Sequence, residues 1–204
     1  MAYAAHTGTR RNLAALAGAG WGLLLSPGKP RDPRFVHALD NGAWGAFQQG
    51  KPFDVAAFEK HVGAHADGAE FVVVPDIVAA GLDSLRVSLG WLPRLAGVAK
   101  RRLLAVQDGM SAADVAPYLS PEVGIFVGGS TEWKLATMRA WGQLARTHGA
   151  YLHVGRVNTI RRIRYCQDAG ADSFDGTSAT RFCCTLPALD NARRQRNLFG
   201  GLHA

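Results

Sequence analysis

The chain has few cysteines and lacks any long hydrophobic run. Its cysteines are Cys166, Cys183 and Cys184, an odd number of which two are adjacent. Adjacent cysteines rarely bridge each other, which argues against a secreted, disulfide-stabilised fold and for reduced thiols. No apolar run approaches the roughly 20 residues that cross a bilayer, and the first residues show neither a basic leader nor a cleavage site. We therefore expect a cytoplasmic protein with no membrane partner.

Linkers and low-complexity segments are also lacking, and acidic residues are in the minority. The 204 residues, of which 48% are hydrophobic, are enough for one substantial core, so we expect a single domain over residues 1–204. Against 16 Asp and Glu there are 23 Lys and Arg, a net charge of +7, and a basic tail begins at about residue 182. This excess favours polyanionic partners because each neutralised phosphate releases counterions; a solvated basic surface is the alternative.

Eight short apolar runs alternate with amphipathic segments along the chain. The apolar runs, predicted to be strands, cover residues 3–5, 21–25, 35–39, 71–74, 103–106, 124–127, 151–154 and 171–174. The amphipathic segments, predicted to be helices, cover residues 10–17, 54–66, 82–99, 111–119, 132–147 and 158–168. Residues 26–34 contain three prolines and are predicted to be a loop. The alternation predicts parallel strands joined by right-handed crossovers.

The predicted fold class is α/β, a (βα)8 TIM-barrel-like domain. Eight strands favour closure into a barrel, although the chain is short beside the about 250 residues of a typical complete barrel. We therefore expect a compact barrel, with an incomplete barrel or a doubly wound sheet as the alternatives. Seven of the predicted strands are followed by polar residues, within HTGT, DNGAW, PD, QDG, GGSTEW, GR and DGTS. In a parallel barrel these segments meet at the face that binds ligands, which favours an enzyme.

Two aspartates at predicted strand ends carry the chemistry that we expect at that face. Asp175 is followed by the small residues 176–178, which let a ligand approach the backbone; the alternative is that Asp175 caps the next helix. Asp40 lies in LDNGAW, which alone indicates a tight turn. Two carboxylates at one barrel mouth raise each other's proton affinity, so that one is nucleophilic while the other moves protons. Asp76 and Asp108 add to this set, unless they are solvated turn residues.

Four strand-end segments resemble, in order, those of the tRNA-guanine transglycosylase family. Residues 40–43, DNGA, are similar to that family's DSGGF, and residues 105–109, AVQDG, resemble IVQGG. Residues 127–130, VGGS, resemble IGGL, and residues 174–181, FDGTSATR, resemble FDCVLPTR. Each segment alone is weak evidence, but the shared order covers the chain from about residue 36 to residue 181. The resemblance implies a barrel enzyme that exchanges a base in a nucleic acid.

The resemblance also implies roles for single residues. Asp175 would attack the anomeric carbon of a guanosine nucleotide, release guanine and leave a covalent sugar-enzyme intermediate, as in retaining glycoside hydrolysis. Asp40 would shuttle the proton and bind the incoming 7-deazaguanine. The residues that would contact this base are Asp76, Gln107, Gly128, Gly129 and Ser130. His153, in YLHVG, stands where the family has an apolar residue; it would touch a substituent of the ring, or be a core or strand-end histidine.

The sequence departs from the family at the zinc site and in its length. The family places three closely spaced cysteines and a later histidine after the nucleophile, whereas here Cys183, Cys184 and His203 follow. Adjacent cysteines fit a relaxed tetrahedral site poorly and a third thiolate is missing, so we predict no metal and no cofactor. Small relatives in bacteriophages and bacterial DNA-modification clusters exchange guanine in DNA for a 7-deazaguanine. The compact size and basic composition resemble that branch, which implies DNA rather than tRNA as the partner, in the host cytoplasm if the chain is phage-encoded.

Nucleic-acid binding is assigned to Arg156, Arg161 and Arg181. A duplex would have to present a flipped nucleotide, because its anomeric carbon and base edge are otherwise enclosed. Trp44 and Trp91 are candidates for stacking, whereas Trp133 and Trp141 have the spacing of core or interface residues. None of these four tryptophans is counted as a site residue. Three alternatives stay open: an enzyme acting on tRNA, an unrelated barrel enzyme in which VGGS and FDGTS cradle a phosphate, and a non-catalytic nucleic-acid-binding protein.

Overall fold

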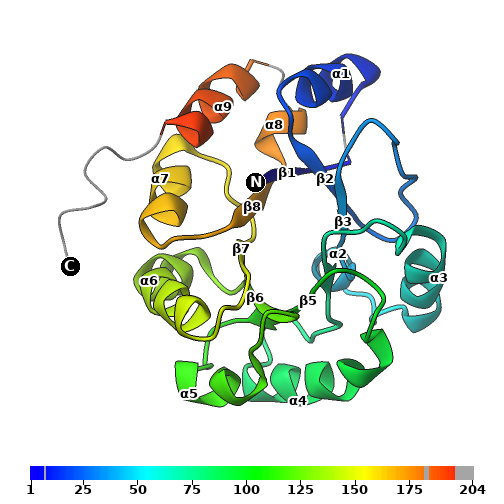
Figure 1. Cartoon of the computed structure of the whole chain (residues 1–204). Coiled ribbons are helices and arrows are strands. Elements are labelled where there is room, and N and C mark those ends of the chain that lie inside the picture. Colours follow the sequence, from blue (N-terminus) through cyan, green and yellow to red (C-terminus); the bar gives the residue numbers. More distant parts are fainter. Residues whose placement is uncertain (7, 182–183, 196–204) are drawn as a thin grey trace.

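The computed structural model describes residues 1–6, 8–181 and 184–195, and its centre is a closed barrel of eight parallel strands. Each strand pairs with the next along the chain, and β1 pairs with β8 to close the ring (Figure 1). The strands are β1 (Ala2–Ala5), β2 (Gly22–Leu25), β3 (His37–Leu39), β4 (Val72–Val73), β5 (Arg102–Val106), β6 (Val123–Val127), β7 (Leu152–Val154) and β8 (Ser173–Gly176). The predicted (βα)8 TIM-barrel-like fold is confirmed, and the barrel is closed.

Helices surround the strands on all sides of the barrel (Figure 1). They are α1 (Arg10–Gly18), α2 (Ala43–Gln48), α3 (Val55–His65), α4 (Leu82–Trp91), α5 (Ala112–Val115), α6 (Thr131–Thr147), α7 (Ile160–Asp168), α8 (Ser178–Arg181) and α9 (Leu186–Arg194), with the 3-10 helices η1 (Pro93–Leu95) and η2 (Ala116–Tyr118). The helix predicted over residues 82–99 ends earlier, at Trp91, because Pro93 has no N–H to continue it. In the described part of the chain, none of the helices has the length and apolar character of a membrane span.

Short elements let the barrel close within 204 residues. Residues 26–34, between β2 and β3, form no helix, as their three prolines predict. Strand β4 has two residues in the ladder, β3 and β7 have three each, and α5 and α8 have four each. Each strand-helix unit of this chain is therefore shorter, on average, than a unit of a typical barrel.

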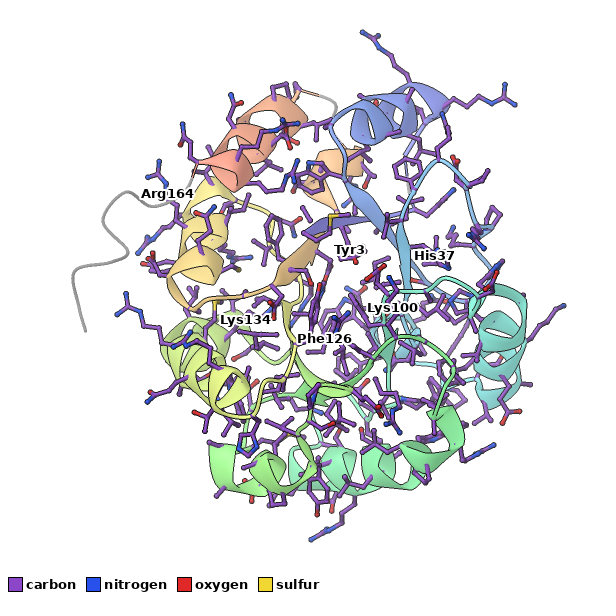
Figure 2. The ribbon with its side chains drawn as sticks, in the orientation of Figure 1. Tyr3, His37, Lys100, Phe126, Lys134 and Arg164 are labelled. Carbon is purple, nitrogen blue, oxygen red and sulfur yellow. The ribbon has the colours of Figure 1, made fainter. Side chains whose placement is uncertain are left out.

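The hydrophobic core has an inner and an outer part, as the alternation of side chains along each strand requires. The inner part fills the barrel and consists of Tyr3, Leu24, Ala38, Phe71, Val73 and Leu103, with Phe126 and Tyr151 packed against it. Figure 2 shows Tyr3 and Phe126 within the ring of strands. The outer part lies between the strands and the helices and includes Leu16, Leu25, Leu39, Phe58, Leu104, Ile125 and Ile163. A side chain at Gly22 would lie 2.7 Å from the Tyr3 ring, so glycine at this position makes room for an aromatic ring inside the barrel.

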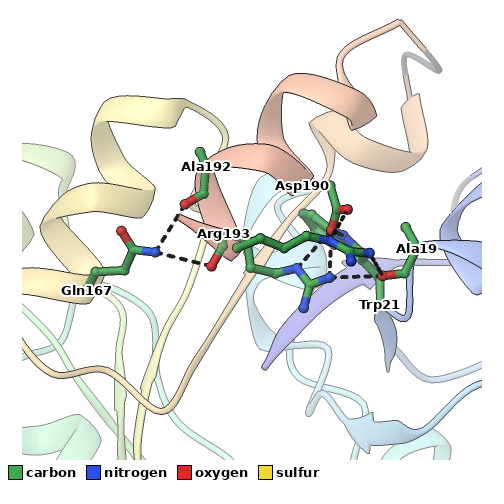
Figure 3. A network of polar contacts seen from close by, with 7 residues as sticks. Ala19, Trp21, Gln167, Asp190, Ala192 and Arg193 are labelled. Atoms are coloured by element: carbon green, nitrogen blue, oxygen red, sulfur yellow. Dashed lines mark hydrogen bonds and ion pairs between the residues drawn. The ribbon is translucent and has the colours of Figure 1, made fainter. Parts of the chain in front are cut away.

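The described chain ends in helix α9, which is docked against the connection between α1 and β2. In Figure 3, Trp21 Nε1 donates to Asp190 Oδ1 at 2.9 Å, and Arg193 donates to the carbonyl of Ala19 at 2.9 Å, which ties α9 to the α1–β2 connection. Arg193 and Arg194 both form ion pairs with Asp190. Within the predicted basic tail from about residue 182, residues 186–194 form a helix in which Arg193 and Arg194 pair with Asp190. Phe182, Cys183 and residues 196–204 lie outside the described residues.

Candidate active site

Asp175 lies in β8 at the carboxyl end of the barrel, with 8% of its surface exposed. Its Oδ2 is 3.0 Å from Nε2 of His153, whereas its Oδ1 receives one long contact, from the backbone N–H of Arg156 at 3.4 Å. The alternative role as a helix cap is not observed, because Asn158 Oδ1 accepts the backbone N–H groups of Thr177 and Ser178 instead. One carboxylate oxygen of Asp175 is therefore held, while the other has no strong partner in the described chain.

His153 is fully buried beneath Asp175, in the barrel core. Its ring is stacked on Phe126, with centroids 4.9 Å apart and planes at 21°, and it contacts Phe71 on another side. Its Nδ1 lies 2.7 Å from Oγ of Ser173. Both ring nitrogens are thus engaged, and the ring has no surface for a base to touch. Of the two placements considered for His153, the structure has the core histidine.

The protonation of His153 follows from its surroundings. Burial lowers the pKa of the imidazole, and the hydrogen bond with Asp175 only partly opposes this effect. A neutral imidazole carries one N–H, and an ionised carboxylate can only accept, so we assign the proton to Nε2, facing Asp175. Nδ1 then accepts from the Ser173 hydroxyl. Ser173 and His153 thus form a buried polar chain that reaches Asp175.

A serine, a histidine and an aspartate in contact also suggest a hydrolytic catalytic triad. In such a triad the serine must be accessible to the substrate, and here it is not. Ser173 is 1% exposed and lies below His153, away from the mouth, so its hydroxyl cannot meet a substrate. Asp175 is the member of this group that lies at the mouth. Of these three side chains, the carboxylate is therefore the one that a ligand at the mouth could reach, and the histidine and serine lie beneath it.

Asp40 and Asp76 supply two further carboxyl groups at the same mouth. Burial raises the pKa of Asp40 to about 6, helped by the negative charges of Asp175 and Asp76 and opposed by a 2.9 Å hydrogen bond from Ser26 Oγ. Burial also raises the pKa of Asp76 to about 6, opposed by a 2.8 Å hydrogen bond from Asn41 Nδ2. The structure thus brings Asp175, Asp40 and Asp76 together, with two carboxyl groups that exchange protons near neutral pH.

The raised pKa of Asp40 predicts an effect on stability. In the folded state its pKa is about 6 against an ordinary value of 3.8, so ionising it costs folding free energy as pH rises from 3.8 to 6, and the full cost remains above that range. Asp40→Asn removes this cost. We expect the variant to gain about 1–3 kcal/mol in free energy of unfolding at pH 8 and almost nothing at pH 4, measured by urea denaturation. Equal gains at both pH values, or none at pH 8, would contradict the assignment.

A cavity of about 290 Å³ opens beside Asp40. Its walls come from the end of β2, the end of β3, helix α2 and the loop before α3, and include Ser26, Pro27, Asp40 and Asn41. The amide of Asn41 bonds the carbonyl of Val74 at 2.9 Å, while its Oδ1 accepts the backbone N–H of Ala43 at 2.8 Å, which makes this wall rigid. Sequence reasoning missed Ser26, although it directly follows a predicted strand.

Gln107 was predicted to contact a base, but the structure gives its amide another task. Its Nε2 donates to the carbonyl of Ile77 at 2.9 Å and its Oε1 accepts the N–H of Ala79 at 2.6 Å. These bonds hold the β4–α4 loop, in which Ala79 adopts a φ of 61°, a strained conformation for a residue with a side chain. Gln107 is 4% exposed, so in this arrangement it supports the mouth without facing it.

The glycine-rich segment after β6 also has its own partners. The backbone N–H and the hydroxyl of Ser130 both bond the carboxylate of Asp108 at 2.6 Å, and Ser130 caps α6. The N–H of Gly128 belongs to the strand ladder, and the carbonyl of Gly129 accepts from the guanidinium of Arg156. Asp108 is therefore held by the start of α6 and is not part of the carboxylate group at the mouth.

Of the three arginines assigned to nucleic-acid binding, the structure brings Arg156 to the mouth. Its guanidinium lies 4.2 Å from the centre of the Trp44 ring on α2, and its φ is 60°. Arg161 instead donates to the hydroxyl of Tyr165 at 3.0 Å, one turn further along α7. Arg181 is exposed at the end of α8. Arg156 and the 39% exposed Trp44 thus form a cation-aromatic pair across the mouth.

Within the residues that the structure describes, no group of three or more His, Cys, Asp or Glu side chains is arranged to hold a metal ion. Cys166 and Cys184 are free thiols, and Cys183 and His203 of the predicted incomplete zinc motif lie outside the described residues. No protein-family model matches the chain, and no curated protein does. The resemblance to transglycosylases therefore rests on the four strand-end segments of the sequence alone.

Proposed function

We propose that this protein is a DNA-guanine transglycosylase, which exchanges guanine in DNA for a 7-deazaguanine through a covalent aspartyl-nucleotide intermediate. One observation carries the proposal: Asp175 has one oxygen held by His153 and the other open at the mouth, beside two carboxyl groups with pKa values near 6. A nucleophilic carboxylate next to a proton-transferring carboxyl is what a retaining exchange at an anomeric carbon requires.

In the first half of the reaction, Oδ1 of Asp175 attacks C1′ of the target nucleotide. The C1′–N9 bond breaks as the O–C1′ bond forms, and protonated Asp40 gives its proton to the departing guanine. The transition state resembles an oxocarbenium ion, which the negative charge of Asp175 stabilises before the bond forms. In the second half, ionised Asp40 takes the N9 proton of the 7-deazaguanine, whose N9 displaces Asp175 from C1′. Atoms and charges balance over the two halves.

The cavity beside Asp40 supports a small bicyclic base as the exchanged group. Its volume of about 290 Å³ lies at the lower end of the range for small-molecule pockets. Asp40 lines it and offers a carboxyl group for in-plane hydrogen bonds, while the amide of Asn41 is engaged with Val74, Ala43 and Asp76. Asp40 thus lines the base cavity and is near enough to Asp175 for their charges to interact, as a proton shuttle requires.

Charge and aromatic groups support a nucleic acid as the second substrate. The net charge of +7 favours a polyanion. At the mouth, Trp44 and Arg156 offer a flat face on which an unstacked base or sugar can pack, as single-stranded nucleic-acid sites commonly do. DNA is proposed over tRNA because the basic composition and the lack of three closely spaced cysteines after Asp175 resemble the DNA-acting branch of the family. A cytoplasmic enzyme acting on bacterial or phage DNA meets this substrate directly.

The proposal predicts incorporation of base from solution into DNA. The protein is incubated with guanine-containing DNA and labelled 7-deazaguanines, in parallel with tRNA, and the polymers are digested to nucleosides. Label is expected in DNA at guanine positions, and not with an Asp175→Asn protein. Label in tRNA alone would make the protein an RNA-acting enzyme, and label in neither polymer would favour the second candidate, a barrel enzyme for a small phosphorylated substrate. That candidate is favoured by one observation, the convergence of Lys134, Arg156 and Arg162 on one small cavity.

A further inference from the structure

A small group of cations lies on the β6–β7 side of the mouth. Lys134 of α6, Arg156 after β7 and Arg162 of α7 line a cavity of about 10 Å³ together with Thr131, the first residue of α6. The Arg162 guanidinium makes two long contacts, to the carbonyl of Arg156 at 3.4 Å and to the hydroxyl of Thr131 at 3.5 Å. Side chains from two helices and one strand end therefore converge on one point.

Within the described residues, none of these three cations has a carboxylate within ion-pair distance. Elsewhere the structure pairs its cations readily, as Lys100 does with Glu70 and Arg193 does with Asp190. Lys134 is the sharpest case, because it is only 5% exposed and bonds a single acceptor, the carbonyl of Gly155. A buried ammonium with two N–H groups left over is costly unless an anion joins it.

The three positive charges also repel each other, which is the situation that a bound anion would relieve. Burial and the positive charges of Arg156 and Arg162 together lower the pKa of Lys134 to about 8, although the negative charge of Asp175 opposes them. Burial and the charge of Arg162 likewise lower the pKa of Arg156. Binding an anion among them would relieve this repulsion and raise the pKa of Lys134.

The position of the group relates it to the nucleophile. Gly155, which Lys134 bonds, is so close to Asp175 that a side chain there would lie 3.3 Å from Oδ2, and the next N–H, of Arg156, lies 3.4 Å from Oδ1. An anion held by Lys134 and Arg156 would therefore lie on the Gly155–Arg156 side of Asp175. In a nucleotide, the phosphates are joined to the anomeric carbon through one sugar ring, so the anion nearest to the reacting carbon is a phosphate.

We infer that Lys134, Arg156, Arg162 and the Thr131 hydroxyl bind a phosphodiester group of the polynucleotide next to the nucleotide that reacts at Asp175. The inference rests on the proposed function and deepens it. The cavity admits about one oxygen atom, so the ligand is held at the cavity entrance by a non-bridging oxygen and is not enclosed. A phosphodiester, whose chain must leave on both sides, fits an open site of this kind.

The test is the salt dependence of DNA binding by variants of one helix. Arg162→Gln is compared with Arg164→Gln, an exposed residue two positions along α7, on the outer side of the molecule in Figure 2. Affinity for a guanine-containing oligonucleotide is measured by fluorescence anisotropy at several salt concentrations. Arg162→Gln is expected to lose about tenfold in affinity and to flatten the slope of log K against log salt by about 1, while Arg164→Gln and Arg162→Lys keep the slope.

Further measurements distinguish failure of the phosphate site from failure of the proposed reaction on which the inference rests. Replacing the phosphate beside the reacting guanine by neutral methylphosphonate is expected to weaken binding to wild type but not to Arg162→Gln. Equal slopes for Arg162→Gln and Arg164→Gln would overturn the site even if label enters DNA. A flattened slope without any base exchange would leave the site standing and remove the proposed reaction. Tight binding of inorganic phosphate together with an unchanged slope would overturn the polymer as ligand.

Discussion

Asp175→Asn is expected to abolish the covalent protein-DNA adduct. The amide has no negative charge to stabilise the oxocarbenium-like transition state and is a poor nucleophile, so adduct formation should fall by about 10⁴-fold or more. The shape of the residue is nearly unchanged, and DNA binding should persist. The adduct is measured as a slower band on a denaturing gel after incubation with DNA in the absence of free base.

Asp83→Asn is the matched control for this experiment. Asp83 lies in the first turn of α4, and its side chain is 71% exposed in an ion pair with Arg86. The same chemical change there should leave the adduct at its wild-type level. An undiminished adduct with Asp175→Asn would remove Asp175 from the role of nucleophile.

His153→Met is expected to slow adduct formation by about 10²-fold without weakening DNA binding. Methionine fills similar space between Phe126 and Phe71 but cannot donate to Asp175, so the carboxylate loses the partner that orients its Oδ2. His153→Gln offers an amide N–H in a comparable place and should recover much of the rate. Single-turnover rates and affinities are measured separately, with thermal unfolding to show that both variants fold.

The comparison of the two variants decides between a chemical and a packing role for His153. A packing role predicts that methionine, which suits an apolar site, is at least as active as glutamine. A positioning role predicts the reverse order at equal affinity for DNA. Wild-type rates with His153→Met would show that Asp175 does not need the hydrogen bond from His153 to react.

The meeting of the three carboxylates at one face could be predicted because the ends of the strands can be recognised in the sequence. Alternation of strands and helices implies parallel strands, and the carboxyl ends of parallel strands share one face. Asp40, Asp76 and Asp175 each follow or end an apolar run, so their meeting required only the closure of the barrel. Their pKa values could not be predicted, because burial at the mouth depends on loops such as residues 26–34.

The contacts of His153 and Ser173 beneath Asp175 were not predicted, because they depend on the register between neighbouring strands. Alternation along β7 and β8 does place His153 and Ser173 on the inner face of their strands. Which residues stand side by side depends on how the strands are staggered around the barrel, and here His153 pairs with Ser173. No pattern within either strand specifies that offset.

Lys134 carried a signal that sequence reasoning overlooked. The buried positions of α6 are Lys134, Met138, Trp141, Gly142 and Ala145. Their spacing is that of the inner stripe of a helix, so a lysine at the first position is a charge on an apolar face. The sequence around Gln107 carries no comparable signal. Its amide bonds the β4–α4 loop, and the residues of that loop do not indicate the backbone conformation that makes this bond possible.

The most direct test of Asp175 as the nucleophile is to locate the covalent bond. Wild-type protein is incubated with DNA without free base, denatured and digested with trypsin and nuclease, and its peptides are analysed by mass spectrometry. Cleavage after Arg164 and Arg181 yields residues 165–181 as one peptide. We expect this peptide to gain the mass of a base-free deoxyribose phosphate, because guanine has left, and fragmentation should place it on Asp175. An adduct on Asp40, on Asp76 or on any other residue would contradict the assignment.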